Sequence, residues 1–243
     1  MKTIALYSLS QVSVAPVISE SERQEALRVL CATYEREKRW VADGSQIFST
    51  DDLDRFDVAW FLARRGREPV GVLRVLFNPP LTVYAGHGFQ PVPGTTFDVT
   101  EFLSRCRVAE IGRFAVLPEH RKNHYIAATL MRAAVRDTLE RGFTHYVTDI
   151  FEGERHSPYL FHTRVMGFEP VATHDVGELN CPNRRVTMVL NLQSAYGRLR
   201  RNGGWLFRYL TADWSEALHR RLSGEEWPST PAPAARCHAT VLA

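Results

Sequence analysis

The sequence predicts an α/β (α+β) fold, with a mixed central β-sheet flanked by helices and a helical extension at the C-terminal end. Strand-length apolar runs alternate with segments of helical period between residues 20 and 192. Two of these runs are separated by a short turn around Gly66, which predicts an antiparallel pair within the sheet. With 44% hydrophobic and 23% charged residues, the 243-residue chain has the composition of a globular protein. This composition excludes a mainly disordered or collagen-like chain.

The first helix is predicted over residues 20–36. Ser19 followed by Glu22 can form a capping box, and the apolar stripe consists of Leu27, Leu30 and Tyr34. The hairpin strands are predicted at 58–63 and 70–77, and residues 78–94 are expected to form a loop. Further along the chain, the predicted elements are a strand at 108–116, a helix from about His124 that ends before Gly142, a strand at 143–151, a short helix at 158–166 and a strand at 185–192.

The net charge of +3 is distributed unevenly. Residues 194–223 contain six Arg against Asp213 and Glu216, a net of +4, so the rest of the chain has a net charge of −1. Residues 206–222 also carry large apolar side chains at four-residue spacing. We therefore predict a core domain over 1–193, a basic amphipathic helical extension over 194–223 and a disordered tail over 224–243.

The four cysteines are far apart and include no C-x-x-C pair, which is typical of reduced thiols in a cytoplasmic protein. The sequence has no G-x-G-x-x-G, no G-x-S-x-G and no recognised nucleic-acid-binding module. His120 and His124 would straddle a loop–helix junction, so no metal site is expected.

Residues 108–139 read as a strand, a polar loop and a helix. The free N–H groups at a helix N-terminus, next to Arg121 and Lys122, would suit a phosphate group. The alternative for this segment is a solvated loop with two surface cations.

The segment 119–127, followed by a helix rich in Leu and Met, resembles the donor-binding loop of the GNAT acyltransferase superfamily. Residues 165–170 resemble the end of that family's last helix and the strand that follows it. His124 and Ile126 stand where the family has small residues, and Thr163 stands where many members have a Tyr. These differences favour a narrower branch of the superfamily. The acyl donor of that branch carries a single phosphodiester, which needs less room at this loop than the pyrophosphate of acyl-CoA.

Four segments, in order, resemble the acyl-homoserine-lactone synthases and the long-chain N-acyl amino acid synthases. They are Tyr34 with Trp40, residues 54–57 before 60–63, residues 70–76, and residues 110–116. The resemblance covers roughly residues 27–170. It implies a GNAT-like fold and transfer of a fatty acyl group from acyl carrier protein, or from acyl-CoA, to the amine of a small amino-acid-like acceptor. It implies no tightly bound cofactor.

The resemblance and the chemistry together suggest a role for each candidate residue. Glu110 would deprotonate the amine or relay its proton, although it could instead form a salt bridge with Arg74 or Arg113. Arg74 and Arg113 would hold an acceptor carboxylate. Trp40, Asp54 and Asp57 complete the acceptor set, and the two Asp could equally be structural. Tyr159 could protonate the leaving thiolate or simply pack. The donor set is Phe114, Val116, Arg121, Lys122, Asn123, His124, Tyr125 and Ile126.

Alternatives remain open for the extension and for the whole chain. Residues 194–223 could dock on the core, bind an acidic acyl carrier protein or contact the inner face of a membrane. The chain could instead be an acetyl-CoA-dependent N-acetyltransferase of a small amine. A third possibility is a non-catalytic regulator that binds acyl carriers or membranes.

Overall fold

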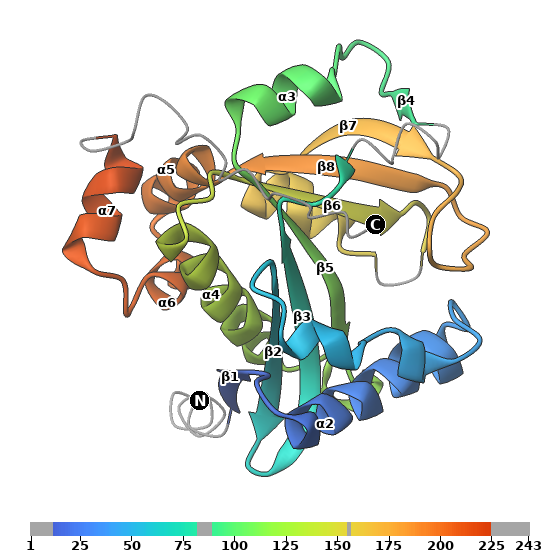
Figure 1. Ribbon diagram of the computed structural model, residues 1–243. Coiled ribbons are helices and arrows are strands. Elements are labelled where there is room, and N and C mark those ends of the chain that lie inside the picture. The colour runs from blue at the N-terminus through green and yellow to red at the C-terminus, as the bar shows by residue number, and fades with distance from the viewer. Residues whose placement is uncertain (1–11, 82–88, 155–156, 225–243) are drawn as a thin grey trace, which may run out of the picture.

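A computed structural model describes residues 12–81, 89–154 and 157–224, and these form a mixed β-sheet flanked by helices (Figure 1). The strand order within the described residues is β1-β2-β3-β5-β6-β8-β7-β4, and β5 with β6 is the parallel pair. The strands are β1 Val12–Pro16, β2 Val58–Arg65, β3 Glu68–Phe77, β4 Gln90–Pro91, β5 Val108–Val116, β6 His145–Phe151, β7 Glu169–His174 and β8 Arg185–Asn191. The predicted fold class is therefore confirmed.

The two faces of the sheet are covered by different helices. Alternate residues of paired strands point to opposite faces, so Leu62 and Val72 pack with α2, whereas Phe61 and Leu73 pack in the cluster that includes α4. The helices are α2 Glu20–Leu30, its π-helical continuation η1 Cys31–Glu37, α3 Val99–Arg105, α4 His124–Glu140, the π-helical η6 Phe161–Met166, α5 Leu192–Asn202, α6 Trp205–Leu210 and α7 Glu216–Ser223. Short 3₁₀ turns are η2 Gly44–Gln46, η3 Thr50–Leu53 and η5 Pro118–His120.

Local signals in the sequence locate several elements correctly. The Ser19 hydroxyl accepts a hydrogen bond from the Glu22 N–H at the start of α2. β5 has the predicted bounds, and α4 begins at His124. Gly142 adopts φ 79° just after α4, a backbone conformation that glycine reaches without a Cβ clash.

The structure also contains elements that periodicity did not reveal. β1, β4 and α3 are short and lie at the edges of the sheet or outside it, so their side chains show little burial pattern. The apolar residues at four-residue spacing over 206–222 do not lie on one continuous helix, contrary to what that spacing would suggest. Residues 211–215 separate α6 from α7, and the Ser215 hydroxyl caps α7 by accepting from the Leu218 N–H.

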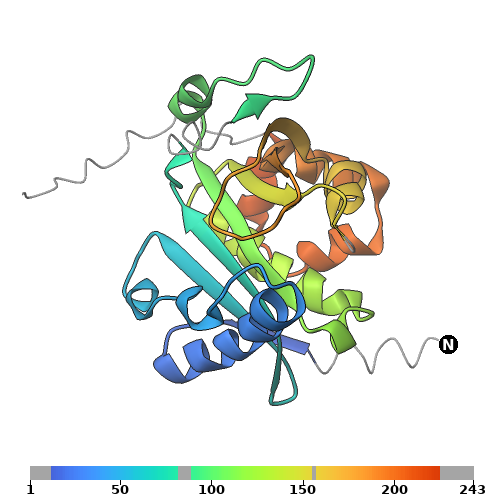
Figure 2. The ribbon, with the colours of Figure 1, turned by 90° about the vertical axis from the view of Figure 1, so that its right-hand side faces the viewer.

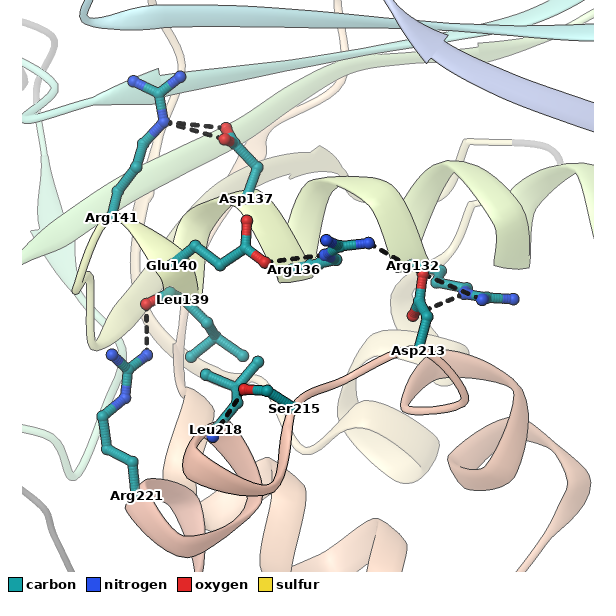
Figure 3. A network of polar contacts seen from close by, with 10 residues as sticks. All are labelled: Arg132, Arg136, Asp137, Leu139, Glu140, Arg141, Asp213, Ser215, Leu218 and Arg221. Atoms are coloured by element: carbon teal, nitrogen blue, oxygen red, sulfur yellow. Dashed lines mark hydrogen bonds and ion pairs between the residues drawn. The ribbon is translucent and has the colours of Figure 1, made fainter.

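The helices after β8 share the main hydrophobic core. Leu199, Leu210 and Leu222 are buried in the same cluster as Leu139 of α4. Figure 3 shows the polar contacts along this junction: Arg132 and Arg136 pair with Asp213, and Arg221 donates to the Leu139 carbonyl. One face of the 194–223 segment is therefore packed against the core. The predicted tail lies outside the described residues from 225 onward. Among the described helices, none combines the length and hydropathy that a membrane span requires.

His145 makes the stability of the fold sensitive to acid. Its ring nitrogens lie 2.8 Å from Thr144 Oγ1 and 3.1 Å from Asn191 Nδ2, and burial lowers the pKa of His145 to about 4. The unfolded chain takes up this proton near pH 6.5, and the folded chain takes it up only near pH 4. The contribution of neutral His145 to the free energy of unfolding is therefore fully present above pH 6.5. It is expected to fall by on the order of 2 kcal/mol as the pH approaches 4.

Urea titrations of the wild type and of His145→Gln from pH 7 to pH 4.5 would measure this contribution. The difference between the two unfolding free energies should shrink as the pH falls. Parallel curves over this range would contradict the assignment.

Candidate active site

A cavity of about 780 Å³ lies where β5 and β6 separate. The two strands pair from Val108 with His145 to Glu110 with Val147, and the ladder ends there although both strands continue. Residues beyond this point on both strands line the cavity, including Ile111 and Phe114 on β5 and Ile150 and Phe151 on β6. The volume is within the range of small-molecule sites, roughly 300–1,000 Å³.

A bulge in β5 borders the cavity. On β3, Val72 pairs with Ala115 and Arg74 pairs with Gly112, so two β5 residues stand opposite one on β3. Arg113, inside the bulge, has φ 48°, which is unusual for a residue with a side chain. A bulge increases the local bend and twist of a strand, and this accounts for the departure of β5 from β6. The backbone edge of β5 beyond Glu110 therefore faces the cavity instead of β6.

Glu110 and Arg74 meet on the wall of this cavity. Arg74 Nη2 lies 2.6 Å from Glu110 Oε1, and both side chains are largely buried. Burial by itself would lower the pKa of Arg74, but the Glu110 carboxylate, together with the more distant charges of Glu178 and Asp52, outweighs it and the pKa is raised. The salt bridge between these residues that the sequence left as an alternative is thus present.

Arg113 lies close to this pair and binds a second carboxylate. Its guanidinium forms an ion pair with Glu178 of the loop between β7 and β8. The Nε atoms of both Arg74 and Arg113 are buried and have no hydrogen-bond partner among the described residues. A molecule bound in the cavity can accept hydrogen bonds from these two buried N–H groups.

The residues predicted to bind the acyl donor fall into two groups. Phe114, Val116 and Arg121 line the cavity. Arg121 donates from Nε to the Val116 carbonyl at 3.0 Å, and its Nη atoms lie 2.6 and 2.5 Å from the two Glu37 oxygens. Arg121 thereby links the end of β5 to the end of η1 at the edge of the cavity.

The other predicted donor residues do not line the cavity. Asn123 caps α4, because its Oδ1 accepts from the Tyr125 N–H at 3.2 Å. Tyr125 packs against Trp205 of α6 with ring centroids 5.4 Å apart, and Ile126 is fully buried in the core. Lys122 and His124 are exposed.

The predicted acceptor residues are also divided. Trp40, Arg74 and Asp57 line the cavity, but Asp57 pairs with Arg55 at 2.9 Å rather than with Arg74. Asp54 does not line the cavity.

Tyr159 also lies outside the cavity lining and is 37% exposed. Pro158, which precedes it, and His162, four residues after Pro158, line the cavity, so the Tyr159 side chain points in another direction.

Sequence reasoning missed several cavity residues. Asp149 accepts from the Thr187 hydroxyl at 2.6 Å, and its other oxygen lies 3.1 Å from His174 Nε2. Burial by itself would lower the pKa of His174, but the hydrogen bond to Asp149, the charge of that carboxylate and the Val176 carbonyl together outweigh it, and the pKa is raised. Asp52 also faces the cavity and accepts from Trp60 Nε1 at 3.0 Å. The strand and turn segments show no local pattern that marks these carboxylates as facing one cavity.

Two segments far apart in the sequence meet beside the cavity. The segment after η1 and the loop between β7 and β8 lie on the same side of the sheet in Figure 2, and the Asn180 N–H donates to the Trp40 carbonyl at 2.6 Å. Lys38 Nζ lies 2.5 Å from Glu154 Oε1 beyond β6. These contacts hold the rim of the cavity together.

Comparisons with solved structures support the fold. The structure of FeeM, an N-acyl amino acid synthase from uncultured soil microbes, superposes with a TM-score of 0.60 at 16% identity. The alignment covers 82% of this chain and 98% of FeeM. A Desulfovibrio desulfuricans protein, described as a candidate acetyltransferase of the GNAT family, matches with a TM-score of 0.50 at 12% identity, over 74% of this chain and 98% of that one.

A third structure, the ribosomal L7/L12 α-N-protein acetyltransferase RimL in complex with coenzyme A, has a TM-score of 0.50 at 11% identity and covers 75% of this chain and 94% of its own. No curated protein sequence matches the chain. The family model described as N-acyl amino acid synthase FeeM matches residues 25–190, which is more than half of the chain. The resemblance stated from the sequence motifs is confirmed, and this acyltransferase with a GNAT fold belongs to the FeeM family of N-acyl amino acid synthases.

Proposed function

We propose that this acyltransferase moves a fatty acyl group from acyl carrier protein, or less readily from acyl-CoA, to the amine of an amino acid. The observation that carries the proposal is the cavity between the separated strands β5 and β6, with the Glu110–Arg74 pair on its wall. Apolar side chains such as Ile111, Met131 and Ile150 line the same cavity and suit an alkyl chain.

Glu110 supplies the proton acceptor. The amine nitrogen attacks the thioester carbonyl carbon, the amine proton moves to the Glu110 carboxylate directly or through one water, and the C–S bond breaks to release the carrier as its thiolate. Arg74 holds this carboxylate in place through its 2.6 Å contact. The β5 edge beyond Glu110, which β6 does not use, offers backbone N–H groups to the thioester oxygen.

Arg74 and Arg113 supply the site for the acceptor carboxylate. Their Nε–H groups are buried beside the cavity with no partner in the described part of the chain, and a guanidinium binds a carboxylate through paired N–H donors. Trp40, Asp52 and Asp57 are placed to shape the space for the acceptor side chain.

The activity is tested by incubating the purified protein with dodecanoyl donors and a panel of amino acids. Mass spectrometry should detect N-dodecanoyl amino acids, formed faster from acyl carrier protein than from CoA. Turnover confined to acetyl-CoA and simple amines would instead favour an N-acetyltransferase, and binding of acyl carriers without turnover would favour a regulator.

The preference for a carrier-bound donor is expected to depend on the C-terminal extension. Arg198, Arg200 and Arg201 of α5 are exposed and form no ion pair with any described residue, so their charge is available to an acidic partner. Replacing Arg200 and Arg201 by Glu should lower kcat/KM for acyl carrier protein by roughly tenfold and leave acyl-CoA unaffected.

Steady-state rates with both donors, in low and moderate salt, measure this effect. The control is Arg220→Glu on α7, where the arginine already pairs with Glu216 at 3.3 Å. Equal losses with both donors would show that the arginines serve the fold. If the double replacement of Arg200 and Arg201 instead releases the protein from anionic vesicles, the extension serves peripheral membrane contact.

A further inference from the structure

Glu178 joins an exposed loop to a buried guanidinium. Its side chain is 74% exposed, and that of Arg113, with which it forms an ion pair, is 13% exposed. Both residues line the cavity. An exposed carboxylate at the end of a flexible side chain therefore reaches inward to a cation on the cavity wall.

The loop that carries Glu178 is held by other contacts. Arg185 is buried, and its guanidinium donates to the carbonyls of Asp175, at 2.7 Å, and of Leu179. The Asn180 N–H donates to the Trp40 carbonyl. The backbone on both sides of Glu178 is thus fixed independently, and Glu178 can leave Arg113 by rotating its side chain alone.

The charges on this wall explain why a carboxylate is drawn there. Arg74 and Arg113 are two buried cations, and Glu110 is the carboxylate beside Arg74. A buried cation without a counter-charge is costly, so Arg113 requires a second carboxylate. Glu178 supplies it from the loop.

We propose that Glu178 occupies the acceptor-carboxylate site and that the acceptor displaces it on binding. This inference rests on the proposed function, in which Arg113 binds the acceptor carboxylate. When an acceptor displaces Glu178, its own carboxylate becomes the counter-charge of Arg113. A neutral amine or an amide supplies no such charge. Glu178 therefore lowers the affinity of acceptors whose carboxylate takes its place on Arg113, and leaves unchanged the affinity of neutral ligands, which do not displace it.

Binding measurements with Glu178→Gln test the proposal without turnover. Calorimetry would compare an N-dodecanoyl amino acid with its primary amide on the wild type and on the variant. The carboxylate ligand should bind the variant about two- to fivefold more tightly, as expected for loss of an exposed competing ion pair of roughly 0.3–1 kcal/mol. The preference for the carboxylate over the amide should increase by the same factor.

Glu152→Gln is the matched control, because Glu152 forms an exposed ion pair with Arg184 at 2.8 Å and does not line the cavity. It should change neither affinity. Weaker carboxylate binding by Glu178→Gln would overturn the proposal and make Glu178 part of the acceptor site. Unchanged affinity, or equal changes with acid and amide, would also overturn it. A wild type that binds these ligands but acylates no amino acid would contradict the proposed function and leave the displacement result intact.

Discussion

Glu110→Gln is expected to reduce kcat for acyl transfer by roughly 10²- to 10⁴-fold, the range of a lost general base. The amide oxygen of Gln can still accept from Arg74 Nη2, so the contact that spans β3 and β5 survives while the proton acceptor is lost. Single-turnover rates with a dodecanoyl donor would isolate the chemical step. The KM for the acceptor should change much less than kcat.

Gly112→Ala provides a second test of the same carboxylate. A Cβ at this position would lie 3.0 Å from Glu110 Oε1 and would crowd the carboxylate without changing its charge. We expect a kcat between that of the wild type and that of Glu110→Gln. Undiminished transfer by Glu110→Gln, with unfolding unchanged, would remove this residue from the mechanism and leave the salt bridge with Arg74 as its role.

Leu222→Ala is expected to lower the free energy of unfolding by about 2–5 kcal/mol, the usual cost of a truncated core leucine. Leu222 is 2% exposed and belongs to the cluster that also contains Leu139 of α4. Urea denaturation followed by circular dichroism would measure the change in midpoint at constant slope.

Arg220→Ala is the control on the same helix, because this arginine pairs with Glu216 at the surface. Its effect on unfolding should remain within about 0.5 kcal/mol. If Leu222→Ala unfolds like the wild type and only loses use of acyl carrier protein, the extension would be a docking element with no part in the core.

Much of the fold could be predicted because it is encoded in local patterns. The period of the apolar residues predicted β5 and α4, and Ser19 and Gly142 marked helix ends through side-chain and backbone chemistry that involves only near neighbours. β1 and β4 escaped prediction because a short edge strand buries little of either face.

The candidate site could be predicted only in part. Glu110 and Arg74 lie 36 residues apart but on neighbouring strands, so motif order was enough to expect them together. Tyr125 and Ile126 belong to the same segment as Arg121, yet they point to α6 and to the core because the turn of α4 directs them there. Motif position located this segment but not the direction of its side chains.

The sequence by itself determined the fold class, the acyltransferase family and the residue types available for catalysis, because period, capping and motif order act over short stretches of chain. Only the tertiary structure decided which of these residues meet. The bulge at Arg113, the end of the β5–β6 ladder at Glu110 and the contact of Arg113 with Glu178, 65 residues away, depend on strand register and loop anchoring. Register and anchoring are set by packing of the whole sheet, and no local segment contains that information.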